Sequence, residues 1–243
     1  MVENHESDAP LRVYLHIPAT GGVSLSAALK SAVPDLVEMR SQEQIEGFNL
    51  MSVENRSQIT ALAGHIPYGV HSFLGRECVY ATMLRHPIDR LISTCTKQIV
   101  ADGRELSDVT IRDFLLPDSR PVADNMLVRR LCSYEWPISD IHWSWRTSFG
   151  GVTHEMFEQA KLNLSRCAFV GIYEKYEESA RQTFEVFDLP KHDVPRLNVS
   201  KYDRARLAPS AEDRQALEEL NRFDTALYQL AVEMFPHSTT PRD

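Results

Sequence analysis

Two adjacent glycines, Gly21 and Gly22, separate an apolar run at residues 11–17 from an amphipathic stretch at residues 22–32. The first N–H groups of a helix have no partner within the helix and lie at the positive end of its dipole. A glycine turn at the start of a helix can therefore surround an anion with amide donors, so the arrangement favours phosphate binding. The same glycines also suit an ordinary tight turn with positive φ, and no Gly-Lys-Ser/Thr follows as a Walker A motif would require.

A second segment, residues 80–94, supports the phosphate interpretation. Its apolar run ends at Arg85, Pro87 is placed to begin a helix, and Ser93 lies two turns into that helix. The planar guanidinium of an arginine can donate two parallel hydrogen bonds to phosphate oxygens, and a serine hydroxyl adds a further donor. The structural alternatives are a surface ion pair for Arg85 and a helix-surface position for Ser93.

At these residues the chain resembles the sulfotransferases that use 3′-phosphoadenosine 5′-phosphosulfate (PAPS), especially their carbohydrate and bacterial branch. That branch has a His-Ile-Pro-Lys-Thr-Gly-Gly-Thr-Ser turn and a later Leu-Arg-Xaa-Pro-Xaa-Xaa-Arg-Xaa-Xaa-Ser segment. This chain has, in the same order, His16-Ile-Pro-Ala-Thr-Gly-Gly-Val-Ser24 and Leu84-Arg-His-Pro-Ile-Asp-Arg-Leu-Ile-Ser93. The likeness extends from about residue 11 to residue 235, through residues 64–69, 124–129, 169–179 and 198–200.

The resemblance implies a nucleotide site built from three parts of the chain. The glycine turn would hold the 5′-phosphosulfate, the second segment would hold the 3′-phosphate, and a basic loop at residues 198–206 would close over it. The residues implied are Pro18, Ala19, Thr20, Gly21, Gly22, Val23, Ser24 and Leu25 in the turn, Arg85 and Ser93 in the second segment, and Asn198, Ser200 and Lys201 in the loop. Without the resemblance, the basic loop and the pair Arg129 and Arg130 are equally consistent with a solvated surface.

Sulfuryl transfer also needs a base, because the attacking hydroxyl or amine of the acceptor must lose a proton. Histidine suits this role near neutral pH. His65 is the candidate base, since it follows a predicted strand that ends at Gly64 and would project from the carboxyl edge of the sheet. His71 is the second candidate base and also a candidate substrate contact, whereas His16 and His86 are expected to order the two turns. A hydrogen-bonded structural role is the alternative for His65.

Ala19 is where the chain departs from the family pattern, because relatives have a lysine there that bridges the sulfate and the leaving oxygen. Loss of a preorganised donor aimed at developing charge lowers rates by roughly 10²–10³. Arg12, Lys97 and Lys201 are the candidate substitutes, and Val23 replaces a family threonine. Three accounts stay open: a deliberate substitution, a natural enzyme that uses another cation, and a natural protein that binds nucleotide without catalysis.

The elements that must position these residues alternate along the chain. Short apolar runs rich in branched residues predict strands, and apolar residues spaced by three and four predict helices. The strands are expected at residues 11–17, 35–39, 59–64, 78–84 and 167–172, and the helices at residues 22–32, 87–102, 123–133, 153–164, 174–187 and 210–234. This alternation predicts an α/β, P-loop-like three-layer fold, in which a central parallel sheet flanked by helices binds ligands at its carboxyl edge.

Composition indicates a single domain at residues 11–236, between disordered tails at residues 1–10 and 237–243. The 243 residues are 43% hydrophobic, and no apolar run approaches the ~20 residues that span a bilayer. The first ten residues are polar and acidic rather than a signal peptide, so we expect a cytoplasmic protein with no membrane partner. The cysteines are scattered without metal-ligand spacing, which predicts reduced thiols and no metal; they are Cys78, Cys95, Cys132 and Cys167.

The sequence therefore favours a PAPS-dependent sulfotransferase that acts on a small-molecule or sugar-bearing acceptor. A net charge of −8 argues against a nucleic-acid polymer or a highly sulfated polymer as partner. An aromatic segment with Trp136, Trp143 and Trp145 can stack on a sugar or anchor the core instead. The alternatives are a binding module that holds PAPS or its product PAP without catalysis, and a P-loop kinase, whose lysine this chain lacks. Oligomeric state stays open.

Overall fold

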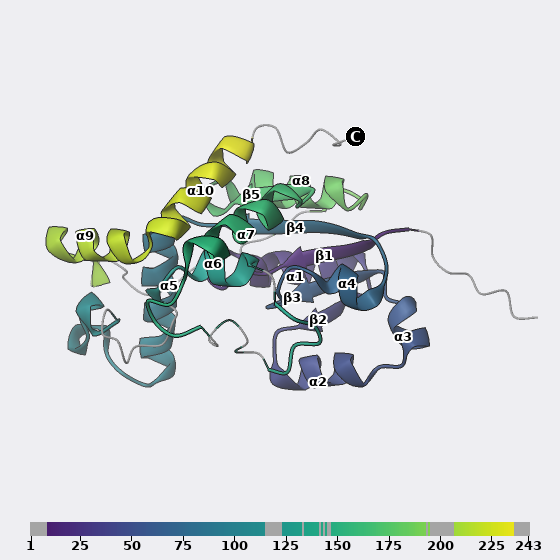
Figure 1. The fold of residues 1–243 in the computed structure, drawn as a ribbon, viewed down its shortest axis with the longest axis horizontal. Helices are drawn as coiled ribbons and strands as arrows, with labels where there is room; N and C mark the ends of the chain where they lie inside the picture. The colour runs from purple at the N-terminus through teal and green to yellow at the C-terminus, as the bar shows by residue number, and fades with distance from the viewer. Residues whose placement is uncertain are drawn as a thin grey trace, which may run out of the picture.

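A computed structural model describes residues 9–114, 123–132, 134–140, 142, 144, 147–192, 194 and 207–235. Within this part of the chain, five strands form one sheet (Figure 1). They are β1 (Leu11–Leu15), β2 (Val37–Met39), β3 (Ala61–Gly64), β4 (Cys78–Leu84) and β5 (Phe169–Ile172), in the spatial order β2-β3-β1-β4-β5. Each neighbouring pair is parallel, so the carboxyl ends of all five strands meet at one edge of the sheet.

The strands form where short apolar runs can be buried on both faces, as is typical of a parallel sheet covered by helices. Every residue of β3 and β5 is buried, and in the central strand β1 only Arg12 is partly exposed. The five predicted strands are confirmed, and their ends lie within two residues of the expected positions.

Helices cover both faces of the sheet (Figure 1). One face carries α1 (Gly22–Ala32) and α8 (Tyr176–Val186), and the other carries α4 (Val70–Leu74), α6 (Met126–Leu131) and α7 (His154–Ser165). The helix α5 (Pro87–Ala101) runs across the carboxyl edge of the sheet, roughly perpendicular to the strands. The predicted α/β three-layer fold is thus confirmed, and it places the ends of β1, β3 and β4 opposite α5.

The remaining helices lie at the two ends of the molecule. Beside β2 lie α2 (Gln42–Leu50) and α3 (Val53–Ser57). The helices α9 (Ala211–Leu220) and α10 (Arg222–Met234) come after residues 195–206, which lie outside the described part of the chain. Three short 3-10 turns complete the described elements: η1 (Leu106–Asp108), η2 (Ile111–Phe114) and η5 (Tyr173–Lys175). No described helix combines the length and the apolar character that crossing a membrane requires.

Two predicted helices differ from the structure. The stretch at residues 210–234 is two helices rather than one, because Asn221 leaves helical geometry with φ −107 and ψ 27. The helix expected at residues 123–133 is shorter and begins after Asn125, whose φ of 42 is left-handed. The four cysteines are free thiols, as expected. The predicted tails lie outside the described residues apart from residues 9 and 10, and the single domain stays a prediction.

Candidate functional site

The glycine turn between β1 and α1 has the geometry of an anion-binding loop. Gly21 has a φ of 82 and Ala19 a φ of 66, so the chain reverses through left-handed conformations before α1 begins at Gly22. In this described stretch, α1 has neither a side-chain cap hydrogen bond nor an acidic residue in its first turn. A helix start without an acidic residue in its first turn suits an external anion, because the positive end of the helix dipole attracts negative charge.

Close packing accounts for both glycines. A Cβ on Gly22 would lie 1.9 Å from Cδ2 of His16, and a Cβ on Gly21 would lie 2.8 Å from Cε2 of Tyr176. The turn is tightened further by Thr20, whose hydroxyl donates to the carbonyl of Ile17 at 2.7 Å. The pair of glycines therefore packs the turn against a histidine on one side and against α8 on the other.

Two histidines meet beside this turn, at the ends of neighbouring strands. The amide of His16 donates to the carbonyl of Gly64 at 2.8 Å, and the amide of His65 donates to the carbonyl of Met39 at 2.9 Å. Their ring centroids lie 4.6 Å apart. His16 is 4% exposed, so it orders the loop from within, as predicted, whereas His65 is partly exposed at the carboxyl edge.

Both imidazoles are held in the neutral form. Burial lowers the pKa of His16 well below its ordinary value, and the neighbouring His65 lowers it further. Burial also lowers the pKa of His65 to about 3, with further contributions from the positive charges of Arg130 and Arg40. At neutral pH His65 can therefore accept a proton.

Arg85 connects the second predicted segment to the glycine turn. It follows β4, is 7% exposed, and its Nη1 donates to the carbonyl of Ala19 at 3.3 Å. Its guanidinium also lies over the ring of Tyr173, 4.4 Å from the centroid. Ser93 lies on α5 and is buried, 3% exposed. Arg85 is therefore not part of a surface ion pair, and Ser93 does not lie on the exposed surface of its helix.

Further cations surround the two histidines. Nη1 of Arg130, on α6, donates to the backbone carbonyl of His65 at 3.4 Å, and the charges of Arg40, Arg130 and Lys97 all lower the pKa of His16. The interpretation of Arg129 and Arg130 as a solvated face is wrong, because both side chains are buried. Their burial depends on partners distant in sequence, which the local pattern does not reveal.

Arg12, one candidate substitute for the missing lysine, lies elsewhere. It is the second residue of β1, at the amino end of the strand, and its Nε donates to the carbonyl of Phe187 at the end of α8. Arg12 therefore does not reach the glycine turn. Lys97 lies one helical turn after Ser93 on α5, and its side chain is exposed.

The predicted substrate residues His71 and Trp136 come together, but not at the glycine turn. Nδ1 of His71 lies 2.8 Å from the hydroxyl of Tyr80, which is four residues before the end of β4. At about 3.3 Å per strand residue, His71 thus lies on the order of 13 Å along the strand from its carboxyl end. A cavity of about 580 Å³ there is lined by Tyr68, His71, Tyr134, Trp136, Asn163 and Arg166, among others. The predicted residues Trp143, Trp145, Asn198, Ser200 and Lys201 lie outside the described residues.

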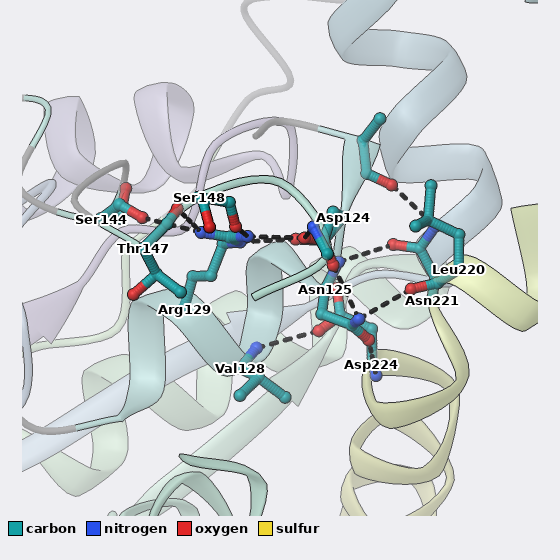
Figure 2. Close-up of polar contacts among 12 residues, drawn as sticks. Asp124, Asn125, Val128, Arg129, Ser144, Thr147, Ser148, Leu220, Asn221 and Asp224 are labelled. Atoms are coloured by element: carbon teal, nitrogen blue, oxygen red, sulfur yellow. Dashed lines mark hydrogen bonds and ion pairs between the residues drawn. The ribbon is translucent and has the colours of Figure 1, made fainter. Parts of the chain in front are cut away.

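A buried polar network fixes α6, the helix that carries Arg130 (Figure 2). The carboxylate of Asp224, on α10, accepts from the amides of Leu127 and Val128 at 2.8 and 2.9 Å. Burial raises the pKa of Asp224 to about 6, although the charge of Arg90 opposes the shift. These residues were not predicted from the sequence; the only local signal is the run of polar residues at 124–125 before an apolar stretch.

Neighbouring side chains complete this network. Asn125 is bound to the segment between α9 and α10, since its amide N–H donates to the side-chain oxygen of Asn221 and its side chain donates to the carbonyl of Leu220. Arg129 pairs with Asp124 and donates to the carbonyls of Thr147 and Ser148 (Figure 2). Among the described residues, no group of three or more His, Cys, Asp or Glu side chains is placed to hold a metal ion. The absence of a metal stays a prediction.

No curated protein sequence matches the chain. The crystal structure of a sulfotransferase from Alicyclobacillus acidocaldarius is similar to it, with 15% sequence identity, a TM-score of 0.49, and coverage of 93% of this chain and 96% of that chain. A family model described as "Sulfotransferase family" matches residues 38–237, which include His65, Arg85 and Ser93 and begin after the glycine turn. Because this match spans well over half of the 243 residues, the chain belongs to the sulfotransferase family.

Proposed function

We propose that this sulfotransferase uses PAPS as its donor and transfers the sulfuryl group to a hydroxyl or amine of a small-molecule or sugar-bearing acceptor. One observation carries the proposal: buried Arg85 donates to the carbonyl of Ala19. This contact joins the two candidate phosphate-binding segments into one site. His65 lies at the next strand end on the same edge, in ring contact with His16 from the turn.

The described residues fit a phosphorylated nucleotide donor. The turn at residues 18–25 offers an uncapped helix start, and the glycines leave no room for side chains between the turn and its neighbours. We assign the 5′-phosphosulfate to this turn and the 3′-phosphate to Arg85 and Ser93. When bound, PAPS supplies the sulfuryl group: the acceptor forms a bond to sulfur, the bond from sulfur to the bridging oxygen breaks, and its electron pair stays on the 5′-phosphate of PAP.

In this proposal His65 takes the proton that the acceptor loses. Its neutral imidazole is a weak base in the free protein, because burial and the nearby Arg130 and Arg40 disfavour the imidazolium. An anion beside these arginines offsets their charge and raises the pKa of His65. The base therefore becomes stronger when the site is filled.

Ala19 gives a specific reason to keep a second candidate function, a module that binds PAP or PAPS without catalysis. The family lysine is absent, and loss of such a donor lowers rates by roughly 10²–10³. The turn and Arg85 do not depend on that lysine for their geometry, since Arg85 contacts the backbone carbonyl at position 19.

The test is transfer of radiolabelled sulfate from PAPS to a pool of hydroxyl and amine acceptors, together with calorimetric binding of PAP. We expect PAP binding by the wild-type chain and measurable transfer. Transfer by A19K but not by the wild-type chain, with equal PAP binding by the two proteins, would favour the binding module. Failure of the wild-type chain to bind PAP would refute the assignment of the donor.

A further inference from the structure

The glycine turn needs a positive charge that its own residues do not provide at position 19. Arg85 approaches Ala19 but donates to the backbone carbonyl there. Arg12 lies at the far end of β1. Arg40 reaches the end of β2, where its Nη2 lies 2.8 Å from a carboxylate oxygen of Glu38, so much of its charge is already balanced.

Arg130 lies closer to the chemistry. Its side chain is 6% exposed and its Nη1 donates to the carbonyl of His65 at 3.4 Å. Of the two arginine charges that lower the pKa of His65, that of Arg130 contributes more, whereas for His16 the charge of Arg40 contributes more than that of Arg130. Arg130 therefore lies beside His65, whose ring contacts the ring of His16 from the glycine turn.

The surroundings of Arg130 favour a negatively charged ligand. Burial and the charge of Arg90 lower the pKa of Arg130 to about 10. Two buried guanidinium groups near each other repel, and an anion placed between them and the turn relieves that repulsion. Burial also reduces the screening of this charge by water.

The helix that carries Arg130 is held in place by contacts within the chain (Figure 2). Asp224 accepts from two amides at the start of α6, and Arg129, the preceding residue, is fixed by Asp124 and by two backbone carbonyls. A donor fixed in this way needs no rearrangement when charge develops near it, which is the condition under which such donors accelerate reactions most.

We infer that Arg130 directs its positive charge at the transferred sulfuryl group and its leaving oxygen, and so fills the role that position 19 does not fill in this chain. The inference rests on the proposed function and extends it. It explains how a chain with Ala19 in its turn can still be a sulfotransferase.

The experiment measures PAP and PAPS affinities of the full chain by calorimetry, because the two nucleotides differ only by the sulfuryl group. R130Q should weaken PAPS binding about tenfold or more relative to PAP binding, as expected for loss of one hydrogen bond to a charged group. A19K/R130Q should regain the preference for PAPS. R181Q is the matched control: it removes an arginine charge from the exposed face of α8, where Arg181 pairs with Glu185, and should change neither affinity.

R130K keeps the test decisive if R130Q does not fold. Lysine retains the charge but has a single compact donor group, so the preference for PAPS should fall severalfold while PAP affinity is unchanged. An equal loss for both nucleotides, or no loss, would overturn the inference, as would a selective loss in K97Q but not in R130Q. Failure of the wild-type chain to bind either nucleotide would instead overturn the proposed function, and the inference with it.

Discussion

Replacing Gly22 with alanine tests the packing that shapes the glycine turn. The new Cβ would lie 1.9 Å from Cδ2, 2.3 Å from Nε2 and 2.5 Å from Cγ of His16. The ring of His16 cannot yield easily, because it is buried and its centroid lies 4.6 Å from that of His65. Overpacking of this kind costs about 1–3 kcal/mol, whereas alanine in place of glycine favours a helix by at most about 1 kcal/mol. G22A should therefore lower the free energy of unfolding by about 1–2 kcal/mol.

The cause can be isolated with a double-mutant cycle. H16A removes the atoms that the new Cβ would meet, so G22A in that background should be neutral or slightly stabilising. The expected coupling between positions 16 and 22 is about 1–3 kcal/mol, measured by urea unfolding with tryptophan fluorescence. G47A is the matched control, because Gly47 lies within the helix α2 and a Cβ there would meet nothing within 4 Å.

Additive effects of G22A and H16A on the free energy of unfolding would refute this prediction. If the double mutant's change in the free energy of unfolding equals the sum of the two single changes to within about 0.5 kcal/mol, the turn does not depend on contact between Gly22 and His16. The same conclusion would follow if G22A were as stable as G47A. PAP binding gives a second measure: G22A should weaken it by displacing the turn, and H16A/G22A should recover part of the loss.

Two further predictions concern protonation. In the free protein an NMR titration should show that His65 stays neutral down to a pKa of about 3, and saturating PAP should raise that pKa; an unchanged value would place the nucleotide elsewhere. Asp224 has a folded-state pKa of about 6, above its ordinary value of 3.8. As pH rises, this carboxyl group therefore loses its proton in the unfolded chain at a lower pH than in the folded protein. The free energy of unfolding should therefore fall by about 2–3 kcal/mol between pH 4 and pH 6 through this group. D224N should flatten that slope in urea unfolding measured across the range, and an unchanged slope would contradict the assignment.

The strands and the glycine turn could be predicted because their signals are local. Each strand is a compact apolar run, and the turn shows its glycines directly. Arg85 could be placed for the same reason, since it ends the apolar run of β4. His65 follows β3 in the same way, and the structure puts it beside His16 as the shared carboxyl edge requires.

Long-range contacts decide what the sequence did not indicate. Arg130 looks like half of a surface doublet, yet it is buried on a helix whose start is bound by Asp224, nearly a hundred residues later. Asn221 divides the last predicted helix because its side chain donates to the carbonyl of Ala123, on a distant segment. His71 follows His65 by six residues, yet the chain returns along the sheet between them, so the two candidates end up at different places.

The backbone conformation at position 19 allows the effect of the missing lysine to be measured by comparing A19K with the wild-type chain. Ala19 already has a φ of 66, so the energetic penalty of a Cβ in a left-handed conformation, about 1–2 kcal/mol, is present in the wild-type chain. Lysine has the same Cβ, and the hydrogen bond from Arg85 goes to the carbonyl rather than to the side chain. A19K therefore adds a cation and its alkyl stem to a turn whose shape is already set. If Arg130 supplies the charge, the added lysine should change transfer little in the wild-type chain and much more in R130Q, so the difference between the two backgrounds measures how far one cation replaces the other.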